Sequence, residues 1–214
     1  MNRLLYIGAS PRKERSRSVM VADHLLARLK ERYPALSVER LDVFDIDLPS
    51  FDQDAVAGRY HLLAGNAVDP EQADAWRDLK KWTDQFLSFD SYLIATPMWN
   101  FGIPYRLKQY IDILTQPSLT FRNDSDGNVE GLAQGRRAII VAASAMPFGS
   151  LPEIDGLDFQ LAYLKAWLGF IGVTDIGAVR VAGTFGPDDV VAAAMAQAFT
   201  DADRLADTCD CAVN

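Results

Sequence analysis

Short, mostly apolar segments alternate along the chain with longer segments that carry an apolar stripe at helical spacing, and this alternation strongly constrains the fold. The apolar segments, interpreted as strands, are residues 4–7, 37–42, 91–96, 138–143 and 173–181. The stripes, interpreted as helices, cover residues 18–33, 70–87, 107–114, 157–171 and 191–205. Apolar strands must be covered on both faces, and a helix after each strand supplies that cover. We therefore predict an α/β fold: a doubly wound, five-stranded parallel sheet with helices on both faces.

The length and charge of the chain indicate how many domains it forms and which kinds of partner it can bind. At 214 residues, the whole chain, 1–214, is expected to form a single domain. Its 21 basic and 29 acidic residues give a net charge of −8, which argues against a nucleic-acid partner that relies on diffuse positive charge. No apolar run is long enough to span a bilayer, and the apolar start at 4–7 is too short for a signal peptide. We expect a cytoplasmic protein with no membrane partner.

Histidine and cysteine are too few and too poorly spaced for a metal site. The two histidines are His24 and His61, and the two cysteines, Cys209 and Cys211, are close to the end of the chain. Neither a Cys-x-x-C nor a His-x-x-x-His pattern occurs, so we predict no metal site.

The segment 43–69 has scattered Pro, Gly and Asp and weak periodicity. We predict a long irregular connection, which in a compact domain is usually functional or mobile. Its central part, 50–66 with Arg59, is a candidate lid over a ligand site.

In a doubly wound sheet the ligand lies beyond the carboxyl ends of the strands, where the strand order reverses. The loop after the first strand, residues 10–18, lacks both the G-x-G-x-x-G and the G-x-x-x-x-G-K-[ST] pattern, which counts against a dinucleotide site and a P-loop. It holds three hydroxyls and four cations at a helix start: Ser10, Ser16, Ser18, Arg12, Lys13, Arg15 and Arg17. Such a helix start favours an anion such as phosphate. The alternative is that Ser16 caps the helix and the cations are solvated.

The loops after the third and fourth strands are unusually apolar. Residues 97–104 include Trp99 and Phe101 between two prolines, and residues 144–149 again follow a core strand. Exposed aromatic side chains and backbone amides suit a flat aromatic ligand, whereas the alternative is a loop packed on its own core. A phosphate cradle beside a planar-ring site describes a mononucleotide with a flat ring, and flavin mononucleotide (FMN) is the natural candidate.

Several motifs occur in order along nearly the whole chain. They are Ser10 with Ser16-x-Ser18, the run Pro-Met-Trp-Asn-Phe-x-Ile-Pro-x-x-Leu-Lys-x-Tyr-x-Asp over 97–112, Thr120-Phe121-Arg122, Gly127 with Gly131-Leu132 and Gly135-Arg136-Arg137-Ala138, and Leu168-Gly169-Phe170-Ile171-Gly172. Together these motifs resemble the FMN-dependent NADH:quinone oxidoreductases known as azoreductases. The resemblance implies a flavodoxin-like fold and a homodimer with one FMN per subunit. It also implies ping-pong transfer of electrons from NADH or NADPH to quinones or azo compounds.

The resemblance also assigns site residues by position. Those implied for the phosphate are Ser10, Ser16, Arg17 and Ser18. Those implied along the ring and ribityl chain are Pro97, Met98, Trp99, Asn100 and Phe101, with the Asn100 amide near flavin N5. Those implied at the pyrimidine end of the ring are Ser144, Ala145, Met146 and Pro147. At these positions the family typically has the sequence Ser-Arg-Gly-Gly. Pro147 has no N–H to donate, so this chain departs from the family at that position.

Because FMN carries the difficult chemistry, we predict no catalytic side chain. Three other functions stay open at this point. An electron carrier of the flavodoxin type shares the acidic charge and the sheet, but flavodoxins are shorter and carry a phosphate loop rich in Thr, Ser and Gly. An NADPH-dependent FMN or chromate reductase shares the fold and differs in its acceptor. A non-catalytic module that has lost FMN is the third, because fold alone does not determine function.

Overall fold

Five parallel strands form the centre of the computed structural model, which describes residues 1–64, 66 and 73–209. The strands are β1 (Arg3–Gly8), β2 (Ser37–Asp42), β3 (Ser91–Pro97), β6 (Arg137–Ala143) and β7 (Asp175–Val181). Their order in the sheet is β2-β1-β3-β6-β7, and each neighbouring pair is parallel. The predicted doubly wound parallel sheet is confirmed. The order reverses between β1 and β3, which places a crevice beyond the ends of these two strands.

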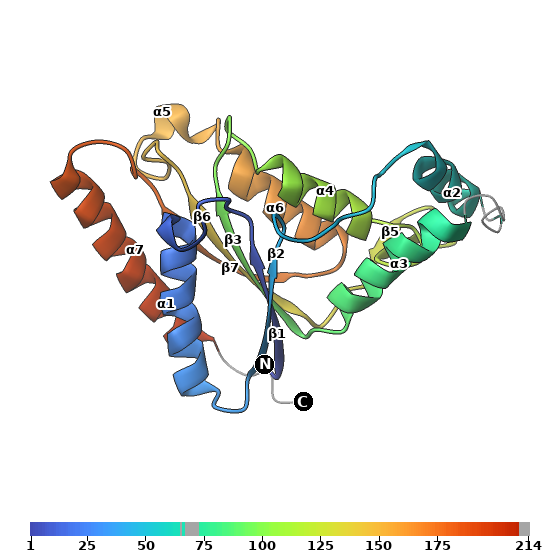
Figure 1. Cartoon of the computed structure of the whole chain (residues 1–214), viewed down its shortest axis with the longest axis horizontal. Helices are drawn as coiled ribbons and strands as arrows, with labels where there is room; N and C mark the ends of the chain where they lie inside the picture. Colours follow the sequence, from blue (N-terminus) through green and yellow to red (C-terminus); the bar gives the residue numbers. More distant parts are fainter. Residues whose placement is uncertain (65, 67–72, 210–214) are drawn as a thin grey trace.

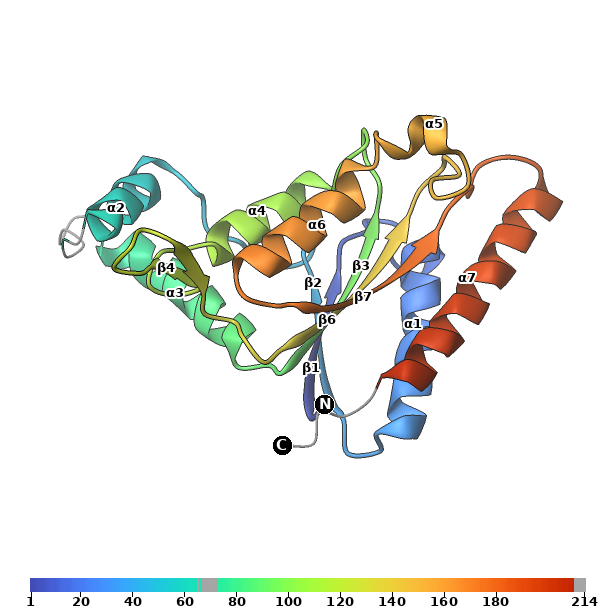
Figure 2. The same ribbon diagram turned by 180° about the vertical axis from the view of Figure 1, so that it is seen from behind.

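Helices cover both faces of this sheet (Figure 1). One face carries α1 (Arg17–Arg32) and α7 (Asp188–Thr208). The other face carries α3 (Ala73–Leu87), α4 (Tyr105–Leu114) and α6 (Phe159–Phe170). The view from behind shows α4 and α6 side by side across the sheet from α1 and α7 (Figure 2). Two shorter pieces, the 3-10 turn η1 (Lys13–Arg15) and α5 (Pro152–Asp155), belong to the loops beyond the strands.

Strand β1 shows why an apolar run becomes a central strand. Leu4 and Tyr6 lie in the hydrophobic core beneath α1 and α7, whereas Leu5 and Ile7 lie in the core beneath α4 and α6. All four side chains are buried. Since successive strand side chains point to opposite faces, an unbroken apolar run is the pattern that a doubly covered strand requires. Each such buried side chain stabilises the fold by about 1.5–3 kcal/mol.

The prediction of an irregular connection over 43–69 is wrong for part of that segment. Residues Gln53–Leu63 form helix α2, which packs against α3. This helix has no apolar stripe, so helical periodicity could not reveal it. The predicted helix start at Pro70 lies outside the described residues, and α3 is described from Ala73.

The boundaries of two later helices also differ from the prediction. Helix α6 begins at Phe159, because the Asp158 carboxylate accepts a hydrogen bond from the Leu161 amide at 3.0 Å and caps the helix. Helix α7 begins at Asp188, one turn before its apolar stripe.

A small antiparallel hairpin interrupts the alternation after α4. It consists of β4 (Phe121–Asn123) and β5 (Val129–Gly131), and a turn at Gly127, where φ is 84°, closes it. Its base lies directly on the turn that ends α6. A Cβ atom added at Gly131 would lie 2.1 Å from the Gly172 nitrogen, so the two backbones meet where only glycine fits.

We expect Gly131→Ala to lower the free energy of unfolding by about 3 kcal/mol, because its added methyl group must displace backbone rather than a flexible side chain. Gly169→Ala is the matched control. That glycine is exposed within α6 and has open space around its Cβ position. The control should raise the free energy by about 1 kcal/mol through helix propensity. Urea midpoints of both variants measure the difference, and equal shifts would contradict the close approach.

Candidate functional site

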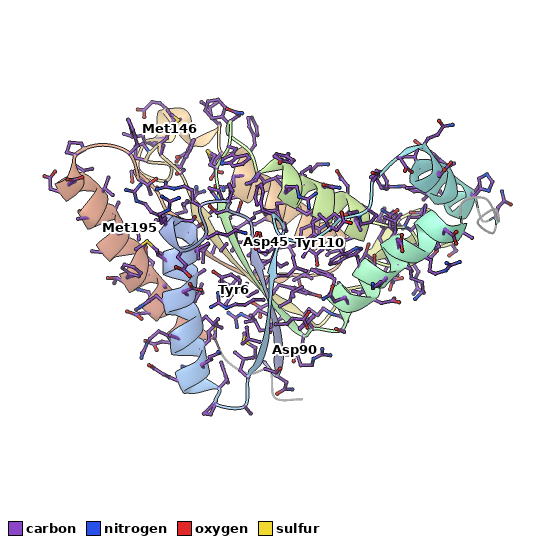
Figure 3. The ribbon with its side chains drawn as sticks, in the orientation of Figure 1. Tyr6, Asp45, Asp90, Tyr110, Met146 and Met195 are labelled. Atoms are coloured by element: carbon purple, nitrogen blue, oxygen red, sulfur yellow. The ribbon has the colours of Figure 1, made fainter. Side chains whose placement is uncertain are left out.

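A cavity of about 260 Å³ opens at the carboxyl ends of β1, β3 and β6, where the strand order reverses. Of the residues predicted for the site, it is lined by Ser10, Ser16, Arg17, Pro97, Met98, Trp99 and Ala145. The other predicted residues, Ser18, Asn100, Phe101, Ser144, Met146 and Pro147, are sequence neighbours of these lining residues. Met146 lies at this edge of the sheet, close to α5 (Figure 3). Three loops far apart in sequence therefore meet in one place.

The hydroxyl groups of the first loop are buried, and two of them lie within hydrogen-bond distance of each other. Ser10, Ser16 and Ser18 expose 2%, 3% and 0% of their surface, and the Ser16 and Ser18 Oγ atoms are 3.0 Å apart. Ser16 occupies the N-cap position of α1, yet its side chain makes no capping hydrogen bond. Amides in the first turn of a helix have no helical acceptor. The loop therefore presents hydroxyl and amide donors together, an arrangement that fits a phosphate group.

Two of the four predicted cations line the cavity, and a third is used elsewhere. Arg12 and Arg17 line it. Lys13 instead turns toward the end of β2, where its Nζ atom lies 2.8 Å from Asp42 Oδ2 and 2.6 Å from Oδ1 of Asp45, which is labelled in Figure 3.

This lysine anchors the loop rather than supplying charge to the cavity. Burial disfavours the charged ammonium, but the hydrogen bonds to both carboxylates outweigh burial and raise the pKa of Lys13 above its usual value. The residue also adopts φ 52°, a left-handed conformation that is uncommon outside glycine. The two ion pairs offset part of the cost of that conformation.

The loop after β3 is a tight turn with two strained residues. Trp99 and Gly102 exchange backbone hydrogen bonds of 2.9 and 3.0 Å, and the residues between them, Asn100 and Phe101, have φ angles of 48° and 69°. Left-handed non-glycine residues of this kind cost about 1–3 kcal/mol each and cluster at functional sites. Trp99 and Phe101 expose 37% and 42% of their surface. The loop therefore does not bury its aromatic side chains in the core, as the alternative interpretation required.

The loop after β6 is tied to the loop after β7. The Ser144 carbonyl oxygen accepts from the Thr184 hydroxyl at 2.9 Å, and the Met146 carbonyl oxygen accepts from the Gly183 amide at 3.1 Å. Thr184 itself lines the cavity. Sequence reasoning did not single it out, because a threonine in a Gly-Thr-Phe-Gly loop carries no specific signal.

Other candidate side chains have structural partners away from the cavity. His24 Nε2 lies 2.8 Å from Asp203 Oδ1, which joins α1 to α7. Cys209 is buried at the end of α7. Within residues 1–64, 66 and 73–209, no three histidine, cysteine or acidic residues form a group suited to a metal ion. No helix in that part of the chain is long and apolar enough to cross a membrane.

Comparison with known proteins identifies the family. A family model described as a flavodoxin-like fold matches residues 2–205. An FMN-dependent NADH:quinone oxidoreductase of Nitratidesulfovibrio vulgaris is 45% identical over 96% of this chain and 99% of its own length. The chain belongs to the FMN-dependent NADH:quinone oxidoreductase family. A second FMN-dependent NADH:quinone oxidoreductase, from Ruegeria pomeroyi, is 39% identical over 88% of this chain and 93% of its own length.

Solved structures agree with this assignment to the FMN-dependent NADH:quinone oxidoreductase family. An azoreductase from Bacillus anthracis str. Sterne matches with a TM-score of 0.86 and 26% identity, over 98% of this chain and all of that chain. An FMN-dependent NADH-azoreductase from Bacillus anthracis str. Ames Ancestor, in complex with FMN, matches with a TM-score of 0.80 and 29% identity. That match covers 96% of this chain and all of that chain. The predicted flavodoxin-like fold and the predicted family are both confirmed.

Proposed function

We propose that this protein is an FMN-dependent oxidoreductase that transfers electrons from NADH or NADPH to quinones and azo compounds. The observation that carries the proposal is the cavity at the β1–β3 switch point, which is lined by buried serine hydroxyls and by residues of an exposed aromatic turn. The relatives named for this activity match almost the full length of the chain. A cytoplasmic location and a single domain over 1–214 stay predictions.

The first loop supports a phosphate site. Ser10, Ser16 and Ser18 would donate hydroxyl hydrogen bonds, while Arg17 and Arg12 would supply positive charge at the same end of the cavity. Charge-assisted hydrogen bonds of this kind are roughly twice as strong as those between neutral groups. The Ser16 hydroxyl makes no capping bond, and its contact with the Ser18 hydroxyl keeps both groups at the start of α1.

The loops after β3 and β6 support a flat-ring site. Pro97, Met98 and Trp99 line the cavity, and the left-handed turn orients the amides of Asn100 and Phe101. On the other side, Ala145 lines the cavity, and Ser144, Met146 and Pro147 would lie along the pyrimidine end of the ring. Pro147 has no N–H, so any amide donor at that end must come from a neighbouring residue.

Bound FMN would supply the redox chemistry, the uptake of a hydride equivalent from the nicotinamide and the delivery of electrons to the acceptor. The chain's own residues bind and orient the ring and leave one face open to both substrates in turn. We assign no side chain as a nucleophile or a general base. Successive use of one site predicts a ping-pong mechanism, with parallel lines in double-reciprocal plots when both substrates are varied.

We also propose a two-fold homodimer in which both subunits border each FMN. Large apolar side chains remain exposed around the cavity and at the starts of α4 and α6: Trp99, Phe101, Tyr105, Leu157 and Phe159. Apolar surface gathered in this way is typical of a protein interface, and two-fold symmetry is the most frequent for closed assemblies. Sedimentation velocity at micromolar concentration should show a dimer, and a fully active monomer would contradict the proposal.

The activity can be tested on the purified protein under anaerobic conditions. We expect a flavin absorbance spectrum that bleaches on addition of NADH and returns on addition of menadione, a simple quinone. A flavin that stays oxidised with NADH or NADPH would favour the electron carrier. Reoxidation by free FMN or chromate but not by menadione would favour the FMN or chromate reductase. A colourless protein that takes up no FMN would leave only the non-catalytic module.

The phosphate site has its own test in the double substitution Ser16→Ala with Ser18→Ala. Loss of two hydrogen bonds to a charged group, each worth about 1.5–3 kcal/mol, should weaken FMN binding at least about a hundredfold. Riboflavin, which lacks the phosphate, should bind almost as before. Ser88→Ala, an exposed serine that donates to the Gln85 carbonyl oxygen, is the control and should change neither affinity. Equal losses for both flavins would mean that the serines act through folding.

A further inference from the structure

Thr184, in the loop after β7, contacts two parts of the cavity. One is the first loop, residues 10–18, called here the phosphate arm, and the other is the loop after β6, residues 144–147, called the ring arm. Its carbonyl oxygen accepts a hydrogen bond from Nη1 of Arg17, at the start of α1. Its amide and its hydroxyl both donate to the carbonyl oxygen of Ser144, at 3.0 and 2.9 Å. Arg17 belongs to the phosphate arm and Ser144 to the ring arm. One residue therefore joins two segments that are more than a hundred positions apart in the sequence.

Backbone hydrogen bonds hold the loop that contains Thr184 firmly against the loop after β6. The amide of Ser144 donates to the Val181 carbonyl oxygen at 3.0 Å, so the pairing of β6 and β7 continues beyond the two strands. The Gly183 amide then donates to Met146 at 3.1 Å. Gly183 has φ 72° and Gly186 has φ 148°, conformations that let the chain turn back on both sides of Thr184.

The link to Arg17 is of a different kind. A guanidinium that donates to a neutral carbonyl oxygen keeps its positive charge, whereas a carboxylate partner would cancel it. Arg17 is half-buried and lines the cavity together with Ser16. The carbonyl of Thr184 thus fixes the direction of a side chain that would otherwise sample many rotamers.

We propose that Thr184 is a positioning residue that couples the phosphate arm of the cavity to its ring arm. It holds Arg17 toward the bound phosphate and holds the backbone of Ser144 and Met146 against the flavin ring. This inference rests on the proposed function, since it requires FMN in the cavity. Its distinguishing consequence is that loss of the Thr184 hydroxyl changes how strongly the protein prefers FMN to riboflavin. A residue that merely stabilised the loops would affect both flavins alike.

The test compares the affinities of the flavin-free, full-length chain for FMN and riboflavin, measured by quenching of flavin fluorescence. Thr184→Val removes the hydroxyl bond to the Ser144 carbonyl oxygen and so loosens the loop whose own carbonyl oxygen holds Arg17, while the pairing of β6 and β7 is kept. We expect it to weaken FMN binding about two- to tenfold, the range for one neutral hydrogen bond, and riboflavin binding by a smaller factor. Thr184→Ser, which keeps the hydroxyl, should restore both affinities. Thr184→Ala replaces Thr184→Val if the valine variant does not fold.

A double-mutant cycle separates coupling from simple loop support. Arg17→Met removes the charge at similar side-chain length and should lower the preference for FMN by itself. If Thr184 acts through Arg17, then adding Thr184→Val to Arg17→Met should weaken the binding of both flavins by the same factor. The control is Thr200→Val on α7, where the hydroxyl donates to the Ala196 carbonyl oxygen at 3.0 Å on an exposed helix face. It should leave both affinities unchanged.

Three results would overturn the inference while the proposed function stands. They are an unchanged FMN affinity in Thr184→Val, equal losses for FMN and riboflavin in that variant, and independent effects of the two substitutions in the cycle. If the unsubstituted chain fails to bind FMN at all, the proposed function fails and this inference fails with it. The urea midpoint of each variant confirms that the compared chains are folded at the temperature of the titrations.

Discussion

The burial of β1 on both faces is the constraint on which the rest of the molecule depends. Leu4 to Ile7 are at most 3% exposed, and β1 pairs with β2 on one side and β3 on the other. A strand enclosed in this way leaves little room for polar groups except beyond its ends, because a buried polar group without a partner is costly. The chain beyond Gly8 is therefore the first place near the centre of the sheet where hydroxyls and cations can gather. The cavity lies there for this reason.

Polar contacts between distant segments then give the cavity its shape. Lys13 holds the first loop to Asp42, the last residue of β2, and to Asp45, and Thr184 holds Arg17 and the loop after β6. The turn at Asn100 and Phe101 stores backbone strain that its flanking hydrogen bonds maintain. The sheet provides the position of the site, and these few contacts provide its geometry.

Much of the candidate site follows from local sequence. Serines and arginines at the start of a helix predict an anion site, and aromatic residues between two prolines predict an exposed apolar loop. Both patterns are local, so the residues that carry them could be named in advance. Helix α2 could not be predicted, because it has no apolar stripe and its packing partner, α3, lies beyond it in the chain. The direction of Lys13 also depends on carboxylates about thirty residues away.

The sequence by itself determined the five strands of the sheet, the helices that alternate with them along the chain, and the loops at the carboxyl edge of the sheet. The spacing of apolar residues along one segment is enough to distinguish a strand from a helix. The family motifs in the sequence likewise indicate FMN without reference to any tertiary contact. Only the tertiary structure decided that Ser16 faces Ser18 instead of capping its helix, that Lys13 leaves the cavity, and that Thr184 joins it. Those choices depend on which side chains the folded sheet brings within hydrogen-bond distance. Residues as far apart as Arg17 and Thr184 acquire a shared role only when parallel strands place their loops at the same edge.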